Sequence, residues 1–122
     1  RIMALGKIKA DQLEHSTAGS VDTQYVVNGS AKLWIQATSA SSISTQGSFN
    51  VSSVTDVNAG ALFPNATSSF ANDDYSVSCV SNDYHVTITD MQTGGFRYTS
   101  HNSSHSATDS SKQCATVHGD LA

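Results

Sequence analysis

The sequence contains few of the residues that characterise several large functional classes. Its 122 residues include two cysteines, one proline and six lysines and arginines, and its net charge is −4. Two cysteines cannot form a disulfide framework or a zinc site on their own, so cysteine usage leaves the redox compartment open. The few basic residues are not clustered, and the chain therefore lacks the positive surface that nucleic-acid binding requires. We expect no nucleic-acid partner.

Long hydrophobic runs are also missing. The longest strongly apolar run, residues 33–35, is far shorter than the ~20 residues of a membrane-spanning helix. Residues 1–7 hold four apolar side chains, fewer than the ~7–15 apolar residues of a signal-peptide core. These features predict no membrane insertion. Because the first methionine is Met3, we interpret the sequence as a piece of a longer protein.

Small hydroxyl side chains are abundant instead. Serine and threonine account for 33 residues, whereas Leu, Ile, Val and Phe together account for 24, about 20% of the chain. Valine outnumbers leucine two to one, which is typical of β-strands. A folded β-domain with so few large apolar residues has a thin core. We therefore expect part of its apolar surface to be buried against other chains.

Alternating hydrophobicity predicts where the strands lie. In residues 31–37 the odd-numbered side chains are apolar and share one face, whereas Trp34 lies on the other face between two polar neighbours. The same period of two recurs in residues 75–80 and 84–89. Seven or eight short strands at roughly 8–12-residue spacing predict an antiparallel β-sandwich or barrel.

Two segments are defined by their turn residues. Asn28 and Gly29 form the dipeptide that most strongly indicates a β-hairpin turn, so we expect residues 24–27 to enter that turn as a strand. Residues 100–111 contain no apolar side chain larger than alanine. We expect this segment to be an exposed loop.

Two strands carry irregular features. Residues 48–56 read as one strand in which the apolar positions change phase, and this predicts a β-bulge near Ser52 and Ser53. Residues 60–67 are a doubtful strand, because Pro64 has no backbone N–H and fits only an edge strand or a bulge.

The sequence lacks the common signatures of catalysis. It contains no nucleophile elbow, zinc-protease helix, phosphate-binding loop or dinucleotide fingerprint. Asp73 and Asp74 form the only adjacent acidic pair, and they precede a strand as a solvated turn would. We expect no enzymatic activity, no metal and no cofactor.

Four segments of the chain occur in an order that matches a known pattern. They are Asn28 to Ile35, Ser48 to Asp56, Phe70 to Val77 and the terminal His118 to Ala122. Together, over residues 24–122, they resemble a C-terminal domain of tail-fibre and related virion structural proteins of tailed bacteriophages. The sequence departs from that pattern at residues 61–65, where the family has a more regular strand.

The resemblance implies a fold, an assembly and a location. Residues 1–23 would be a connector from a preceding shaft, and residues 24–122 a jelly-roll-like β-sandwich at the fibre tip, intertwined as a homotrimer. We expect Trp34 at or near the trimer interface. The protein would reside on the virion, contact other virion proteins and attach to a host-cell receptor, either a glycan or an outer-membrane protein.

The least family-like part of the chain, residues 82–111, holds the candidate receptor-binding residues. Tyrosine offers a flat apolar face with a hydroxyl group, and arginine suits carboxylate or phosphate groups. Such side chains on a rigid sheet edge commonly anchor binding surfaces. The candidates are Tyr84, His85, Arg97, Tyr98, His101, Asn102 and His105.

Alternative interpretations remain open at this point. His101 and His105 could belong to a solvated loop, contact a receptor, or supply rings of metal ligands along a trimer axis. Cys79 and Cys114 lie in strands that we expect to be neighbours, as free thiols or as a disulfide. The alternative functions are a head, neck or baseplate decoration fibre with a purely structural role, and a secreted lectin-like carbohydrate-binding module.

Overall fold

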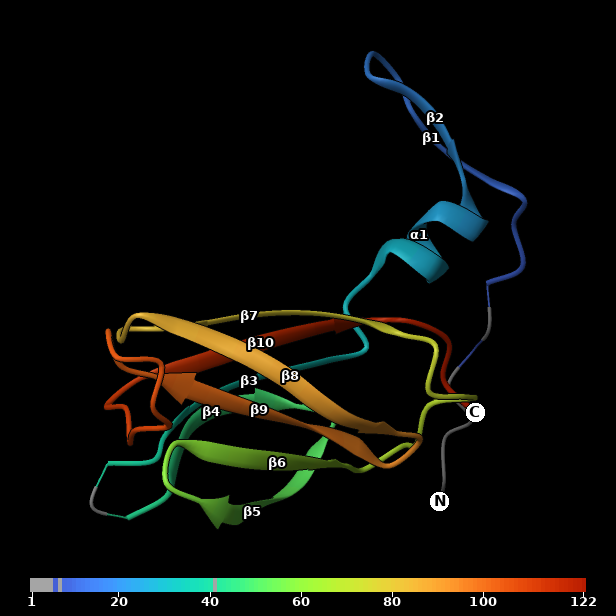
Figure 1. The fold of residues 1–122 in the computed structure, drawn as a ribbon. Coiled ribbons are helices and arrows are strands. Elements are labelled where there is room, and N and C mark those ends of the chain that lie inside the picture. Colours follow the sequence, from blue (N-terminus) through green and yellow to red (C-terminus); the bar gives the residue numbers. More distant parts are fainter. Residues whose placement is uncertain (1–5, 7, 41) are drawn as a thin grey trace. The chain divides into compact units, whose positions relative to one another are not determined.

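The computed structural model describes residue 6, residues 8–40 and residues 42–122. The chain forms two compact units, Arg1–Ser30 and Ala31–Ala122 (Figure 1). We call them the N-terminal unit and the C-terminal unit. The C-terminal unit begins at Ala31, whereas the sequence suggested a boundary before residue 24.

The N-terminal unit contains a hairpin and a short helix. Its elements are β1 (Gln12–His15), β2 (Gly19–Asp22) and α1 (Thr23–Gly29). The strand expected at residues 24–27 and the turn expected at Asn28 and Gly29 are wrong, because these residues lie in α1. A helix pairs its backbone groups internally, whereas a strand here would need a further partner strand. The Thr23 backbone N–H donates to the Asp11 carbonyl at 2.9 Å, which joins the helix to the hairpin.

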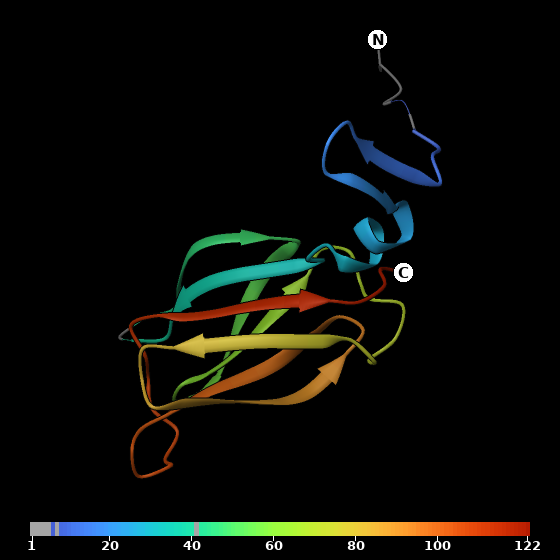
Figure 2. The same cartoon turned by 90° about the horizontal axis from the view of Figure 1, so that it is seen from above.

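The C-terminal unit consists of two antiparallel four-stranded sheets. Their strand orders are β4-β3-β10-β7 and β5-β6-β9-β8 (Figure 2). The strands are β3 (Leu33–Thr38), β4 (Ser44–Phe49), β5 (Val51–Asn58), β6 (Ala61–Ala66), β7 (Ser76–Ser81), β8 (His85–Gln92), β9 (Gly95–His101) and β10 (Gln113–His118). The expectation of an all-β, antiparallel chain is confirmed.

Both sheets contribute to one hydrophobic core. The inner strands β3, β6, β9 and β10 supply most of its buried side chains, and Phe70 and Tyr75 join them from the connection between β6 and β7. In β3 the expected alternation is confirmed, since Leu33 and Ile35 are buried and Trp34 between them is 43% exposed. Phe70 and Tyr75 stack with ring centroids 4.3 Å apart.

The strand order differs from that of a jelly roll. In a jelly roll most consecutive strands lie in different sheets, whereas here β3 and β4, β5 and β6, and β8 and β9 each pair as neighbours within one sheet. The jelly-roll-like expectation is therefore wrong. Alternation of side chains predicts which face of a strand is buried, and it carries no information about which strand lies beside it.

The segment expected as one strand at residues 48–56 belongs to both sheets. Asn50 adopts a left-handed φ of 58° between β4 and β5, and its side-chain amide donates to the Lys32 carbonyl at 2.9 Å. Its side-chain oxygen accepts from the Ser68 N–H at 2.7 Å. The chain therefore changes sheet at Asn50. The predicted bulge is confirmed by the register shift between Val51 and Ser53.

Pro64 lies in an inner strand, contrary to expectation. β6 lies between β5 and β9, and Pro64 itself faces Val54 of β5. On the other side, the pairing with β9 passes from Leu62 to Asn65 and omits Pro64. The missing N–H therefore interrupts no pair on the β9 side. Gly95, whose Cα is opposite Asn65, leaves room for the Pro64 carbonyl group.

Gly60, between β5 and β6, provides a first test of this packing. Its φ is +70°, and a Cβ atom there would overlap the Thr108 carbonyl and lie 2.9 Å from the Ser100 carbonyl oxygen. We expect Gly60→Ala to reduce the free energy of unfolding by about 1–3 kcal/mol, measured by guanidinium denaturation. Gly94→Ala is the control, because a Cβ at Gly94 would meet nothing within 4 Å. Equal stability of the two variants would contradict the tight approach at Gly60.

Candidate functional site

One end of the β8–β9 pair brings together most of the predicted receptor-binding residues. His85 begins β8 and His101 ends β9, and their Cα atoms are register partners. Tyr84 precedes β8, and its backbone N–H donates to the His101 carbonyl at 3.0 Å. Asn102 and His105 follow in the loop after β9. We call Tyr84, His85, His101 and His105 the aromatic cluster.

The aromatic cluster is centred on a pair of stacked imidazole rings. The His85 and His101 ring centroids are 4.6 Å apart, and the planes differ by 6°. The His105 ring lies 5.0 Å from that of His85 at 55°. Tyr84 meets His85 and His105 edge to face, at 5.9 and 6.0 Å. Four flat rings thus gather at the end of a two-stranded ladder.

Asn102 holds the loop that carries His105. Its side-chain oxygen accepts from the Ser104 and Ser106 N–H groups at 2.9 and 3.1 Å. Its backbone N–H donates to the Ser106 carbonyl, and its carbonyl accepts from the His105 N–H, both at 3.0 Å. His105 itself has a φ of 61°. Asn102 is therefore a positioning residue, because it fixes a turn that places the His105 ring.

The aromatic cluster combines an exposed ring with one imidazole, that of His85, that favours the neutral form. The Tyr84 side chain is 67% exposed. Desolvation, followed by the charges of His101 and His105, lowers the pKa of His85. This surface can stack on a flat or apolar ligand group and offer hydrogen bonds from Tyr84 and Asn102.

Arg97 does not belong to the aromatic cluster. It lies nearer the start of β9, where it pairs with Thr89 in the register, and its guanidinium lies 3.1 Å from an Asp90 carboxylate oxygen. Hydrogen bonds from Gln92 and Arg97 hold the pKa of Asp90 below its ordinary value. The sequence grouped Arg97 with the other candidates but could not show that its guanidinium is engaged by Asp90, away from the cluster.

Tyr98 is a core residue, so its prediction as a receptor contact is wrong. Its side chain is fully buried, and its ring lies 5.7 Å from that of Phe96. Burial raises the pKa of Tyr98. Its hydroxyl group is buried without a hydrogen-bond partner. Tyr98 points inward because its Cα is opposite Leu62, another core residue.

A second exposed aromatic site lies on the β4-β3-β10-β7 sheet. Trp34 is opposite Phe49 across the β3–β4 pair, and the two side chains are 43% and 53% exposed. A Cβ at Gly47 would lie 3.3 Å from the indole, so the Trp34 ring rests against the glycine backbone. The sequence predicted that Phe49 and Val51 lie in one strand. The exposure of Phe49 was therefore not expected, because it follows from the change of sheet at Asn50, between these two residues.

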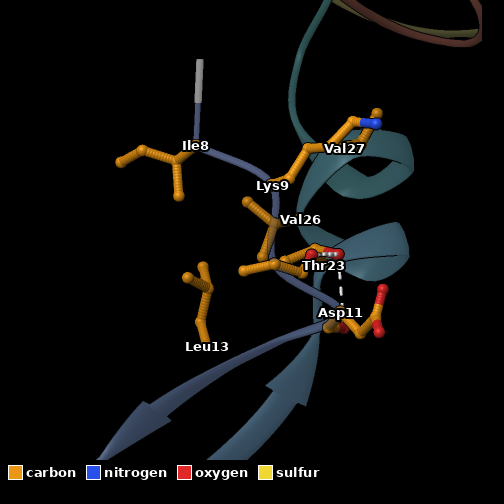
Figure 3. A pocket seen from close by; sticks show the side chains of 8 residues that line it. Ile8, Lys9, Asp11, Leu13, Thr23, Val26 and Val27 are labelled. Atoms are coloured by element: carbon orange, nitrogen blue, oxygen red, sulfur yellow. Dashed lines mark hydrogen bonds between the residues drawn. The ribbon is translucent and has the colours of Figure 1, made fainter. Parts of the chain in front are cut away.

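The N-terminal unit carries an apolar hollow that the sequence did not indicate. It has a volume of about 720 Å³ and lies within this unit (Figure 3). Its apolar walls come from Ile8, Leu13, Val26 and Val27. Ile8 is 92% exposed, Leu13 47% and Val26 43%. The hollow is therefore an uncovered apolar face, unlike the enclosed pockets that bury most of a small ligand.

The cysteines are free thiols on adjacent strands. Cys79 is opposite Ala115 and Cys114 is opposite Val80, so the expected neighbouring strands are confirmed as β7 and β10. Their Cα atoms are one register position apart, and the two side chains therefore point to opposite faces of the sheet. Burial raises the pKa of the Cys79 thiol.

The described residues form neither a metal-binding cluster nor a membrane-spanning helix. In residues 8–40 and 42–122, no group of three or more His, Cys, Asp or Glu side chains is arranged to hold a metal ion. The stacked geometry of His85 and His101 agrees with this, because parallel rings do not converge on one ion. No helix in the described part of the chain has the length and apolarity needed to cross a membrane.

Comparison with known proteins gives no relative for this chain. No family model, curated protein or solved structure matches it.

Proposed function

We propose that the chain is the distal domain of a bacteriophage tail fibre, a β-sandwich that assembles as a homotrimer on the virion and attaches it to the host surface without catalysis. The observation that carries the proposal is the aromatic cluster. Tyr84 exposes its ring while register pairing and the Asn102 turn hold its neighbours. A rigid support beneath exposed aromatic side chains is characteristic of binding surfaces.

Of the two receptor classes, a glycan fits this surface better than an outer-membrane protein. The rings of the aromatic cluster suit the flat apolar faces of sugars, and Tyr84 and Asn102 supply hydrogen-bonding groups. Arg97, the one lysine or arginine of β8 and β9, is engaged with Asp90. The surface therefore favours an uncharged saccharide.

A homotrimer is supported by the incomplete burial of the N-terminal unit. Among its described residues none is buried, although Ile8, Leu13 and Val26 form an apolar face. An isolated two-stranded hairpin is marginally stable in water, and so is a helix as short as α1. Association of copies would cover this face together with Trp34 and Phe49.

The binding proposal is tested with fluorescently labelled protein on a panel of bacterial cells and purified surface polysaccharides. We expect binding to a subset of cells and to the polysaccharides of the same strains. Periodate oxidation of the cells should remove binding, and protease treatment should leave it. Loss of binding after protease treatment alone would point to a protein receptor, and the absence of binding throughout would favour the structural decoration role.

A further inference from the structure

The geometry of the His85–His101 stack favours the neutral form of the His85 ring. The Nδ1 atoms of both rings are buried and have no hydrogen-bond partner. A neutral imidazole has one ring nitrogen that is an acceptor, whereas an imidazolium has N–H donors at both nitrogens. Protonation of His85 would thus place a charged donor without an acceptor at a buried atom. A second protonation would also bring two positive rings within 4.6 Å.

The neighbours of His85 make protonation harder still. The charges that act on it come from His101 on β9 and His105 in the following loop. Tyr84, on its own segment, contributes a neutral ring edge. In the part of the chain that the structure describes, no carboxylate is among the groups that shift its pKa, although Asp83 is only two residues away. No nearby anion therefore compensates an added proton.

The loop after β9 is coupled to this stack through His105. Its ring packs on His85 and on Tyr84, while its backbone has a φ of 61°, a conformation that non-glycine residues adopt infrequently. Besides these rings, hydrogen bonds to Asn102 hold the turn, and a β-bridge between His101 and Ala107 joins its far end to β9. Separation of the His85 and His101 rings would remove the ring packing that holds His105 against His85 and Tyr84.

We propose that the aromatic cluster is an acid-sensitive switch, closed when the His85 imidazole is neutral and opened when His85 is protonated. In the closed state residues 102–106 are held against the end of β8 and β9. In the open state the rings separate, and the loop no longer presents His105 beside Tyr84. The consequence for attachment rests on the proposed function: binding at neutral pH is lost on acidification.

The direction of the effect follows from the pKa of His85. Its folded-state pKa is below the ordinary value of about 6.5, so the unfolded or opened chain binds protons more readily. The stabilisation is complete above the ordinary value and is lost as the pH falls through the lower, folded-state value. Opening is therefore expected as the pH falls below the ordinary value of about 6.5.

The switch is tested by NMR on the full chain, without a receptor. Between pH 7 and about pH 5, we expect the hydrogen-exchange protection factors of the amides of residues 102, 104, 105 and 106 to fall about tenfold. The His85→Phe variant keeps a flat ring that cannot be protonated, and its protection should change by less than twofold. His118→Phe, at an exposed position of β10, should behave like the unmodified chain.

Unchanged loop protection in the unmodified chain at about pH 5 would overturn the switch, as would an equal loss in the His85→Phe variant. Because these readouts need no receptor, they are separate from the proposed function. Cell binding at pH 7 that persists at about pH 5 also contradicts the switch. Loss of loop protection in a chain that binds no cell or polysaccharide at pH 7 would support the switch and contradict the proposed function.

Discussion

Replacement of Tyr98 by alanine is expected to lower the free energy of unfolding by about 3–5 kcal/mol, the range found for large aromatic residues in cores. The Tyr98 side chain is fully buried between the sheets and packs beside Phe96. Its removal would leave a cavity among residues of β6, β8 and β9 that strand pairing prevents from collapsing. The loss is measured by guanidinium denaturation, with circular dichroism as the signal.

Tyr98→Phe is the matched control and has the opposite expected sign. The Tyr98 hydroxyl is buried without a hydrogen-bond partner, so its removal relieves an unsatisfied polar group. We expect the phenylalanine variant to be more stable by about 1 kcal/mol. If alanine at this position left stability unchanged and reduced cell binding, Tyr98 would be a surface residue and the core described above would be wrong.

The second large effect concerns assembly. In light scattering at micromolar concentration, the unmodified chain should have three times its mass of 12.8 kDa. Leu13→Asp combined with Val26→Asp places two carboxylates on the apolar face of the N-terminal unit and should give monomers. Charged groups buried without partners oppose association strongly. A monodisperse monomer of the unmodified chain would refute the homotrimer.

Two further variants separate the contributions to this assembly. Trp34→Ala should weaken association by about tenfold or more, since buried tryptophans are frequent interface anchors. Val80→Ala is the control, because Val80 is also exposed on the same sheet, at 61%, but lies on the edge strand β7. If the two changes weakened association equally, the placement of Trp34 at the interface would be contradicted.

The sequence predicted the parts of the fold that depend on local alternation. The buried face of β3 and the bulge near Ser52 were both correct, because period-two patterning and phase changes are local signals. The sheet change at Asn50 was not predicted. It depends on hydrogen bonds from the Asn50 side chain to Lys32 and Ser68, residues far from it in the sequence.

The candidate site was predicted only in part, for a similar reason. The chemistry of Tyr84, His85, His101 and His105 marked them out, but their proximity comes from the β8–β9 register. The same register sends Tyr98 into the core. The N-terminal helix was missed because Asn28 and Gly29 indicate a turn only when flanked by paired strands.

The most direct test of the account is the binding of a Tyr84→Ala and His105→Ala double variant to cells or polysaccharides that the unmodified chain recognises. These residues are exposed, so the melting temperature and assembly should not change. We predict at least a thirtyfold loss of affinity, about 2 kcal/mol. Arg97→Ala, an outward-facing change on β9 outside the cluster, should bind normally. Normal binding by the double variant would contradict the assignment of attachment to the aromatic cluster.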